Sequence, residues 1–135
     1  MIVVDTNIIS YFYLHSEHSH LAEQILTKDP AWSAPLLWRS EFRNVLALYI
    51  RKAIITLPEA VEIFSWAAEL FQGNEYEVHS AHVLQLSRSS GCSAYDCEFV
   101  NLAQDLGVYL ITQDKKILDN FPATALSMRA FLAVS

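Results

Sequence analysis

The first residues of the chain constrain its fold most strongly. Ile2, Val3 and Val4 are consecutive apolar residues, and Asp5 follows them directly. A short run without polar alternation is typical of a strand that is buried on both faces, as in a parallel sheet. Residues 8–14 could open a helix, so Asp5 would lie where a central strand ends. Ligands of open α/β sheets bind beyond the carboxyl ends of the strands. We therefore expect a functional site at Asp5, to which the fold brings further carboxylates.

The rest of the chain alternates between predicted helices and strands. A second continuous apolar run predicts a strand at 108–112, and weaker patterns predict strands at 31–34, 76–78 and 125–127. Helices are predicted at 20–28, 36–52, 57–72, 81–88, 94–105, 115–120 and 128–133. Such alternation predicts an α/β fold with a parallel sheet and right-handed crossovers. No internal repeat, low-complexity tract or linker-like stretch interrupts it, so we take residues 1–135 as a single domain.

Composition narrows the class of protein. A hydrophobic fraction of 53% over 135 residues excludes a disordered chain. No apolar run approaches the roughly 20 residues that a membrane span needs, and we expect no signal peptide. Cys92 and Cys97 make no CxxC motif and suit a reducing compartment, so we expect a cytoplasmic protein. The net charge of −6 argues against a nucleic-acid binder, unless several acids are gathered in one site and neutralised by bound cations.

Four carboxylates are candidates for such a site, and each also has a structural interpretation. Asp5 and Asp114 could be helix N-caps, and Asp96 lies three residues after Ser93, close to a capping-box arrangement. Glu41 is less easily explained in this way, because its position is on an apolar stripe of the predicted helix 36–52, where an unpaired carboxylate is costly.

The predicted topology favours a common site. Asp5 and Asp114 follow the two clearest strands, and Asp96 begins the helix that leads back into the second one. If these strands are neighbours, the three carboxylates converge at one sheet edge, with Glu41 entering from its helix. Carboxylates in close proximity repel one another, and a hard divalent cation is the usual reason to gather them. An oxygen-only donor set favours Mg²⁺ or Mn²⁺ over zinc.

Four motifs in this order and spacing resemble those of the PIN domain. They are V-V-D-T-N at Val3–Asn7, S-E-x-x-N-V-L at Ser40–Leu46, S-x-Y-D-x-x-x-V-x-L-A at Ser93–Ala103, and I-T-x-D-K-K-I at Ile111–Ile117. The resemblance implies a five-stranded parallel sheet flanked by helices, and an Mg²⁺-dependent endoribonuclease. Single-domain members of this size are mostly toxins of VapBC toxin–antitoxin pairs, which implies a small antitoxin as partner.

The resemblance also assigns the site residues. The acidic site would consist of Asp5, Glu41, Asp96 and Asp114, with Asn7 and Thr112 supporting them by hydrogen bonds. Asp5 and Asp96 are expected to be the primary metal ligands. Cys97 stands where alanine is common, which would place a thiol near the site.

An acidic protein must still hold RNA. Arg39 and Arg43 bracket Glu41, and Lys115 and Lys116 follow Asp114, so these residues could form a local positive rim; ordinary solvated surface is the alternative. The aromatic run Tyr11–Tyr13 could stack on bases, or could form a subunit or antitoxin contact, and a homodimer is expected.

Three other functions stay open. The chain could be a PIN nuclease of RNA processing outside a toxin–antitoxin pair, or a catalytically silent PIN-fold binding module, although the presence of all four acids argues against the second. A phosphatase around Asp5 is disfavoured because Asn7 and Ile9 do not fit the D-x-D-x-T/V pattern, and a receiver domain because Thr112-Gln-Asp114 stands where a late strand should end in lysine.

His15, His18 and His20 lack the spacing of a structural zinc site. His79 and His82 could share a helical face, but no third ligand is evident.

Overall fold

The computed structural model describes residues 1–134 as a five-stranded parallel sheet with helices on both faces. The strands are β1 (Ile2–Val4), β2 (Trp32–Pro35), β3 (Glu75–Tyr76), β4 (Leu110–Ile111) and β5 (Ala125–Leu126). The helices are α1 (Thr6–Tyr13), α2 (Ser19–Lys28), α3 (Leu37–Arg51), α4 (Leu57–Leu70), α5 (Ser80–Ser90), α6 (Ala94–Leu106), α7 (Lys115–Asn120) and α8 (Met128–Ala133). The predicted α/β class, parallel sheet and strand number are confirmed. In the described part of the chain, no helix has the length and apolar character needed to cross a membrane.

The strand order is β3-β2-β1-β4-β5, which puts β1 at the centre of the sheet. Val3 is in register with Leu110, and Val4 with Ile111. The two strands that precede Asp5 and Asp114 are therefore neighbours, as the convergence of the acids required. β1 is buried on both faces, which accounts for its uninterrupted apolar sequence.

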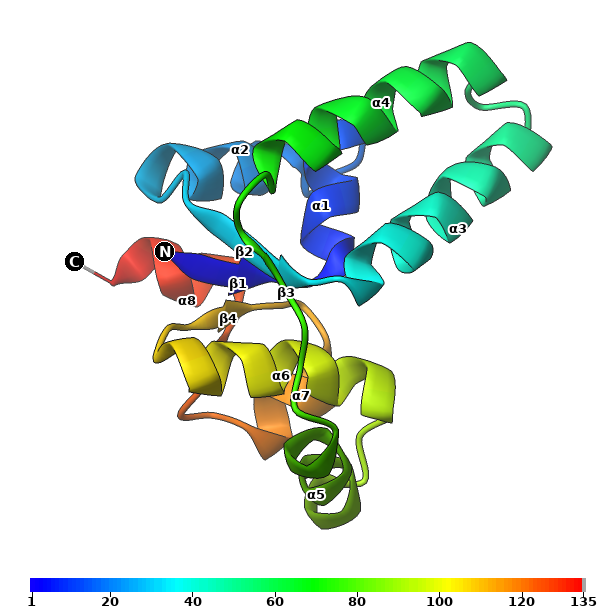
Figure 1. Cartoon of the computed structure of the whole chain (residues 1–135). Helices are drawn as coiled ribbons and strands as arrows, with labels where there is room; N and C mark the ends of the chain where they lie inside the picture. The colour runs from blue at the N-terminus through cyan, green and yellow to red at the C-terminus, as the bar shows by residue number, and fades with distance from the viewer. Residues whose placement is uncertain (135) are drawn as a thin grey trace.

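Helices cover the two faces of the sheet differently. α6 contacts β1, β2 and β4 on one face, and α5 packs against the outer side of α6. On the other face α1 contacts α2, α3 and α4, while α3 and α4 form a hairpin that extends away from the sheet (Figure 1). The core is continuous across the sheet, and its largest fully buried side chains include Trp32, Trp38 and Phe42.

Two details of the fold were not predicted from the sequence. The predicted strand 108–112 is only two residues long, because α6 ends in Gly107 at φ 66° and the Val108 amide still bonds back to the Ala103 carbonyl, 3.0 Å away. On α3 the sequence shows two adjacent apolar stripes, one of Leu37, Val45 and Leu48 and the other of Trp38, Phe42, Leu46 and Tyr49, and its periodicity does not predict which of them is buried. The second stripe is buried at Trp38, Phe42 and Leu46, whereas Leu48 of the first is 39% exposed. Packing of α3 against both α1 and α4 decides its rotation.

Candidate active site

Asp5 is the central residue of the site, at the carboxyl end of β1. It is the N-cap of α1, and its Oδ1 accepts a hydrogen bond from the Ile8 amide at 3.2 Å. Its Oδ2 accepts a hydrogen bond from the Thr112 hydroxyl. The residue is only 7% exposed. Burial raises the pKa of Asp5 to about 6; the hydrogen bonds from Thr112 and Ile8 oppose this shift, and the nearby Asp114 charge adds to it.

Asp114 reaches the same point from β4. It is the N-cap of α7, with Oδ1 accepting from the Ile117 amide at 3.0 Å. The Asp114 amide donates to the Thr112 hydroxyl oxygen at 3.1 Å, so one threonine holds both Asp5 and the loop that carries Asp114. The capping role of Asp5 and Asp114 does not exclude a role in a metal site, because an N-cap leaves part of the carboxylate free for other partners.

Asp96 enters from the first turn of α6. The cap of this helix is Ser93, whose hydroxyl oxygen accepts from the Asp96 amide at 3.0 Å, so the carboxylate of Asp96 is not needed for capping. Burial raises the pKa of Asp96, and the charge of Asp114 raises it further, whereas Lys116 lowers it.

Glu41 completes the set from α3. It is half-buried, and its Oε1 accepts from the Thr6 hydroxyl at 2.6 Å. Burial raises the pKa of Glu41, the Thr6 hydrogen bond opposes this, and the Asp96 charge adds to the increase. Glu98 lies close enough for the charge of Glu41 to raise its pKa, after the larger effect of burial. The sequence analysis did not predict that Thr6 and Glu98 lie near the carboxylates. For Thr6, its position directly after Asp5 was the available signal.

The four predicted carboxylates line one small cavity of about 80 Å³. Its walls are Asp5, Thr6, Asn7, Glu41, Asp96, Phe99, Asp114 and Ile117. We call this the acidic cavity. Four acids from four separate segments meet here, and each of Asp5, Asp96 and Glu41 is made harder to ionise by a neighbouring acid as well as by burial. In this arrangement a bound cation would remove the repulsion.

The donor chemistry fits a hard divalent cation. All four groups are carboxylates, and Mg²⁺ typically takes one or two carboxylates and keeps several waters. Within residues 1–134, no three His, Cys, Asp or Glu side chains form a ready-made metal site. A cation in the acidic cavity would therefore have to keep several water ligands beside the carboxylates.

Two other predicted site features differ in placement. Asn7 lines the acidic cavity and is exposed, but no hydrogen bond joins its side-chain amide to any of the four carboxylates. Its backbone amide instead helps to lower the pKa of Asp5. Cys97 is not among the residues that line the cavity; it belongs to a small core with Val83 and Cys92, and burial raises the pKa of its thiol.

The four predicted RNA-binding cations are not equivalent. Arg39 forms a two-point ion pair with Glu75, at 2.6 and 2.8 Å, and Lys115 pairs with Asp119 at 2.9 Å. The Arg43 guanidinium lies 5.1 Å from the centre of a phenyl ring on α4. Lys116 is close to the acidic cavity, since its charge lowers the pKa of Asp96.

The fold and this cavity can be compared with known proteins. A family model described as the PIN domain matches residues 2–122. The chain belongs to the PIN domain family. A curated relative, Ribonuclease VapC3 of Pyrobaculum aerophilum, is 30% identical over 127 residues, which cover 90% of this chain and 95% of the relative.

Solved structures share the PIN fold of this chain. A crystal structure of a second protein from Pyrobaculum aerophilum aligns with a TM-score of 0.77 at 19% identity, covering 97% of this chain and 92% of the other. A toxin–antitoxin complex from Klebsiella pneumoniae contains a chain that aligns with a TM-score of 0.69 at 16% identity, covering 95% and 98%.

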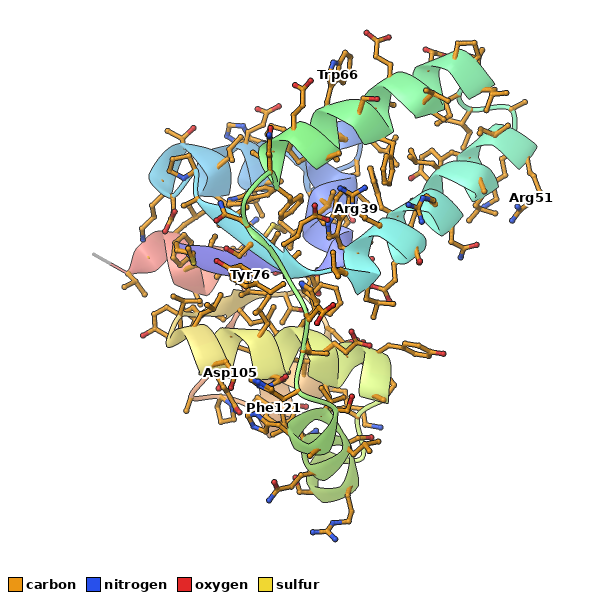
Figure 2. The ribbon with its side chains drawn as sticks, in the orientation of Figure 1. Arg39, Arg51, Trp66, Tyr76, Asp105 and Phe121 are labelled. Carbon is orange, nitrogen blue, oxygen red and sulfur yellow. The ribbon has the colours of Figure 1, made fainter. Side chains whose placement is uncertain are left out.

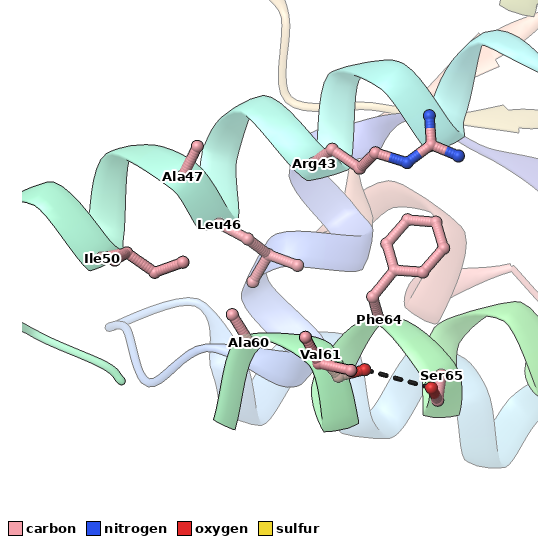
Figure 3. A pocket seen from close by; sticks show the side chains of 8 residues that line it. All are labelled: Arg43, Leu46, Ala47, Ile50, Ala60, Val61, Phe64 and Ser65. Carbon is pink, nitrogen blue, oxygen red and sulfur yellow. Dashed lines mark hydrogen bonds between the residues drawn. The ribbon is translucent and has the colours of Figure 1, made fainter. Parts of the chain in front are cut away.

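A second feature of this PIN domain is an apolar groove between α3 and α4. Its volume is about 310 Å³, and its lining is Arg43, Leu46, Ala47, Ile50, Ala60, Val61, Phe64 and Ser65 (Figure 3). We call it the α3–α4 groove. Further exposed apolar side chains on the hairpin include Leu57 and Trp66; Figure 2 shows Trp66 on the outer side of α4 and Arg51 at the far end of α3.

The domain has another titratable cluster at the start of α5, on the side of α6 away from the sheet. Asp105, labelled in Figure 2, accepts from His79 Nδ1 at 2.8 Å and lies 3.5 Å from His82 Nδ1. The buried Asn101 amide bonds to both His82 and Asp105, at 2.6 and 3.1 Å, and accepts from the His79 backbone amide at 3.1 Å. We call these four residues the His–Asp cluster.

Proposed function

We propose that this PIN domain is an Mg²⁺-dependent endoribonuclease that hydrolyses RNA phosphodiester bonds. The observation that carries the proposal is the convergence of Asp5, Glu41, Asp96 and Asp114 on one cavity. The name of the relative Ribonuclease VapC3, together with the family, supports RNA as the substrate. Mn²⁺ would satisfy the same oxygen donors.

In the proposed mechanism, Asp5 and Asp96 are the primary metal ligands, and Asp114 and Glu41 complete the shell directly or through water. The bound ion would acidify a water and neutralise charge on the phosphate. Thr112 and Thr6 hold Asp5 and Glu41 in orientation. The water oxygen forms a bond to phosphorus as the bond to the 3′-oxygen breaks; a carboxylate accepts the water proton, and the 3′-oxygen takes up a proton. The products are a 5′-phosphate and a 3′-hydroxyl, without use of the 2′-hydroxyl as nucleophile.

The main test replaces Asp96 by Asn. We expect RNA cleavage in Mg²⁺ to fall by on the order of 100-fold or more, because loss of a ligand removes several kcal/mol of charge stabilisation. The matched control is Asp119→Asn, since Asp119 is an exposed acid on α7 whose partner is Lys115. Circular dichroism should show that both variants fold. Full activity in a folded Asp96→Asn protein would reject the mechanism.

We further propose that the chain is the toxin of a type II toxin–antitoxin pair, and that a segment of its antitoxin lies in the α3–α4 groove. The fold is shared with a chain of a toxin–antitoxin complex. Glu41 in the acidic cavity and Leu46 in the groove are both on α3, so one bound segment could cover the groove and put a basic side chain among the carboxylates. A homodimer stays a prediction. The second candidate function is RNA processing outside such a pair.

The groove proposal is tested with Val61→Glu, because Val61 is 59% exposed and lines the groove. We expect the variant to cleave RNA normally but to escape inhibition by the proposed antitoxin, since a charge in an apolar contact must be desolvated. Glu62→Gln, at an exposed neighbouring position, is the control. Equal inhibition of both variants would place the antitoxin elsewhere.

A further inference from the structure

A polar groove of about 470 Å³ lies on the α2–α8 side of the molecule. Its lining includes Glu17, His18, His20, Gln24, Gln113 and Arg129. They come from the α1–α2 connection, α2, the β4–α7 connection and α8. The volume falls in the range of roughly 300–1,000 Å³ that is typical of small-ligand pockets. Imidazole, amide and guanidinium groups stand in the walls beside Leu21, so the groove combines hydrogen-bonding groups with apolar surface.

The polar groove is joined to the acidic cavity through one short loop. Gln113 lies between Thr112, which donates to Asp5, and Asp114, which lines the cavity. The Gln113 side-chain oxygen accepts from the Met128 amide at 2.9 Å and so fixes the start of α8 beside this loop. Arg129 is the next residue of α8. The β4–α7 connection therefore contributes a wall residue to each site, Gln113 to the polar groove and Asp114 to the acidic cavity.

Arg129 is the cationic side chain that an anion would meet in the polar groove. Among the ion pairs of residues 1–134, Arg129 takes part in none, whereas Arg39 and Lys115 are neutralised by Glu75 and Asp119. Glu17 is the one acid among the lining residues, and its carboxylate is 87% exposed and lies 3.4 Å from His18. The formal charges of Arg129 and Glu17 cancel in the lining, so binding of an anion here would depend on direct contact with the Arg129 guanidinium.

An aromatic ring lies beside one wall of the polar groove. The rings of Tyr11 and His18 are 4.6 Å apart, and Tyr11 is close enough to Asp5 for that charge, after burial, to raise its pKa. Aromatic and imidazole rings next to amide groups are the usual partners of unstacked RNA bases, which are read by stacking and by hydrogen bonds to their edges.

We propose that the polar groove is a nucleotide subsite for single-stranded RNA, in which Arg129 binds a phosphate next to the scissile bond and His18, His20 and Gln24 contact the adjoining base. This inference rests on the proposed ribonuclease function. It makes the polar groove a positioning and specificity site, distinct from the carboxylates that carry out hydrolysis.

The test measures binding of a short, fluorescently labelled single-stranded RNA by anisotropy in EDTA, over a series of KCl concentrations. Arg129→Gln should weaken binding several-fold and lower the slope of log affinity against log salt by about 0.7, the value for one phosphate contact on a single strand. Arg129→Lys should keep the wild-type slope. The control is Arg88→Gln, an exposed arginine in the last turn of α5, which should leave the slope unchanged.

Each other outcome overturns the subsite. If the wild type binds and cleaves RNA but Arg129→Gln has the wild-type slope, the subsite is wrong and the ribonuclease proposal stands. If Arg88→Gln lowers the slope equally, the binding is unspecific. If Arg129→Gln binds RNA normally but loses its antitoxin, the groove is a protein contact. If the wild type neither binds nor cleaves RNA, both proposals fail together.

Discussion

The acidic cavity and the His–Asp cluster shift the pKa of a carboxylate in opposite directions. In the cavity, burial raises the pKa of Asp5 to about 6, and its closest charged neighbours are other acids. In the cluster, the hydrogen bond from His79 is the largest effect and lowers the pKa of Asp105, with Asn101 and the nearby imidazole charges acting in the same direction. Among the described residues, no cationic side chain pairs with Asp5, whereas Asp105 pairs with the imidazoles of His79 and His82.

This difference separates a candidate functional site from a structural one. A polar network whose members satisfy one another stabilises the fold and has little need of a ligand. A group of acids that raise one another's pKa values costs stability until a cation binds, and such groups are typical of active sites. The same substitution, Asp to Asn, should therefore change stability in opposite directions at the two places.

The largest effect is expected at Asp5. Without Mg²⁺ at pH 7.5, Asp5→Asn should be more stable than the wild type by up to roughly 3 kcal/mol, because the amide carries no charge to desolvate and keeps an oxygen for the Ile8 cap. In the wild type, the contribution of protonated Asp5 is fully present below pH 3.8 and is lost as pH rises through about 6. The advantage of Asp5→Asn should fall accordingly on acidification. Urea unfolding over pH measures it.

Mg²⁺ sharpens the Asp5 experiment. The ion should raise the melting temperature of the wild type at pH 7.5 and have little effect on Asp5→Asn, because a ligand that binds only the folded state stabilises it. Equal shifts in the two proteins, or a less stable Asp5→Asn in EDTA, would contradict the account of the acidic cavity.

The second effect is at Asn101, which is fully buried in the His–Asp cluster. Asn101→Ala should lower the free energy of unfolding by about 1–3 kcal/mol, because the His79 backbone amide and the groups of His82 and Asp105 lose their partner. Gln104→Ala, at an exposed position of the same helix, should have little effect. RNA cleavage should be unchanged below the melting temperature. A neutral Asn101→Ala would mean that the cluster contributes no stability.

The smallest effect is at Asp105. Asp105→Asn should destabilise the protein at pH 7 by less than about 1 kcal/mol, because the side chain is 35% exposed and its ion pairs are screened by solvent. Since its pKa is lowered on folding, the stabilisation is present above the unfolded value of 3.8 and is lost as pH falls through the folded pKa. The pH dependence is thus opposite to that at Asp5. A stabilising Asp105→Asn would remove the contrast between the two clusters.

The order and type of the elements could be predicted from the sequence because the local signals agree. The continuous apolar run Ile2–Val4 indicates a buried strand, and Ser93 and Gly107 mark the start and end of α6. The same local signals placed Asp5 and Asp114 at strand ends, and adjacency of β1 and β4 then brought them together. This part of the site follows from the rule that parallel strands end at a common edge.

The partners of polar side chains could not be predicted in the same way. Arg39 and Glu75 are far apart in the sequence, yet their ion pair removes Arg39 from the set of free cations. Periodicity gave two possible stripes on α3 and did not select the buried one, because that choice depends on α1 and α4. His79 and His82 had no visible third partner until the packing of α5 on α6 supplied Asp105.

By itself, the sequence determined the alternation of strands and helices, the family motifs, and the four acids that stand at element ends or on one helix face. Tertiary structure decided that Gln113 bonds to the Met128 amide, that Thr6 bonds to Glu41, and which cations stay unpaired. The physical reason is that secondary structure follows from the pattern of neighbouring residues, whereas burial, charge pairing and pKa shifts depend on segments that meet only after the chain has folded.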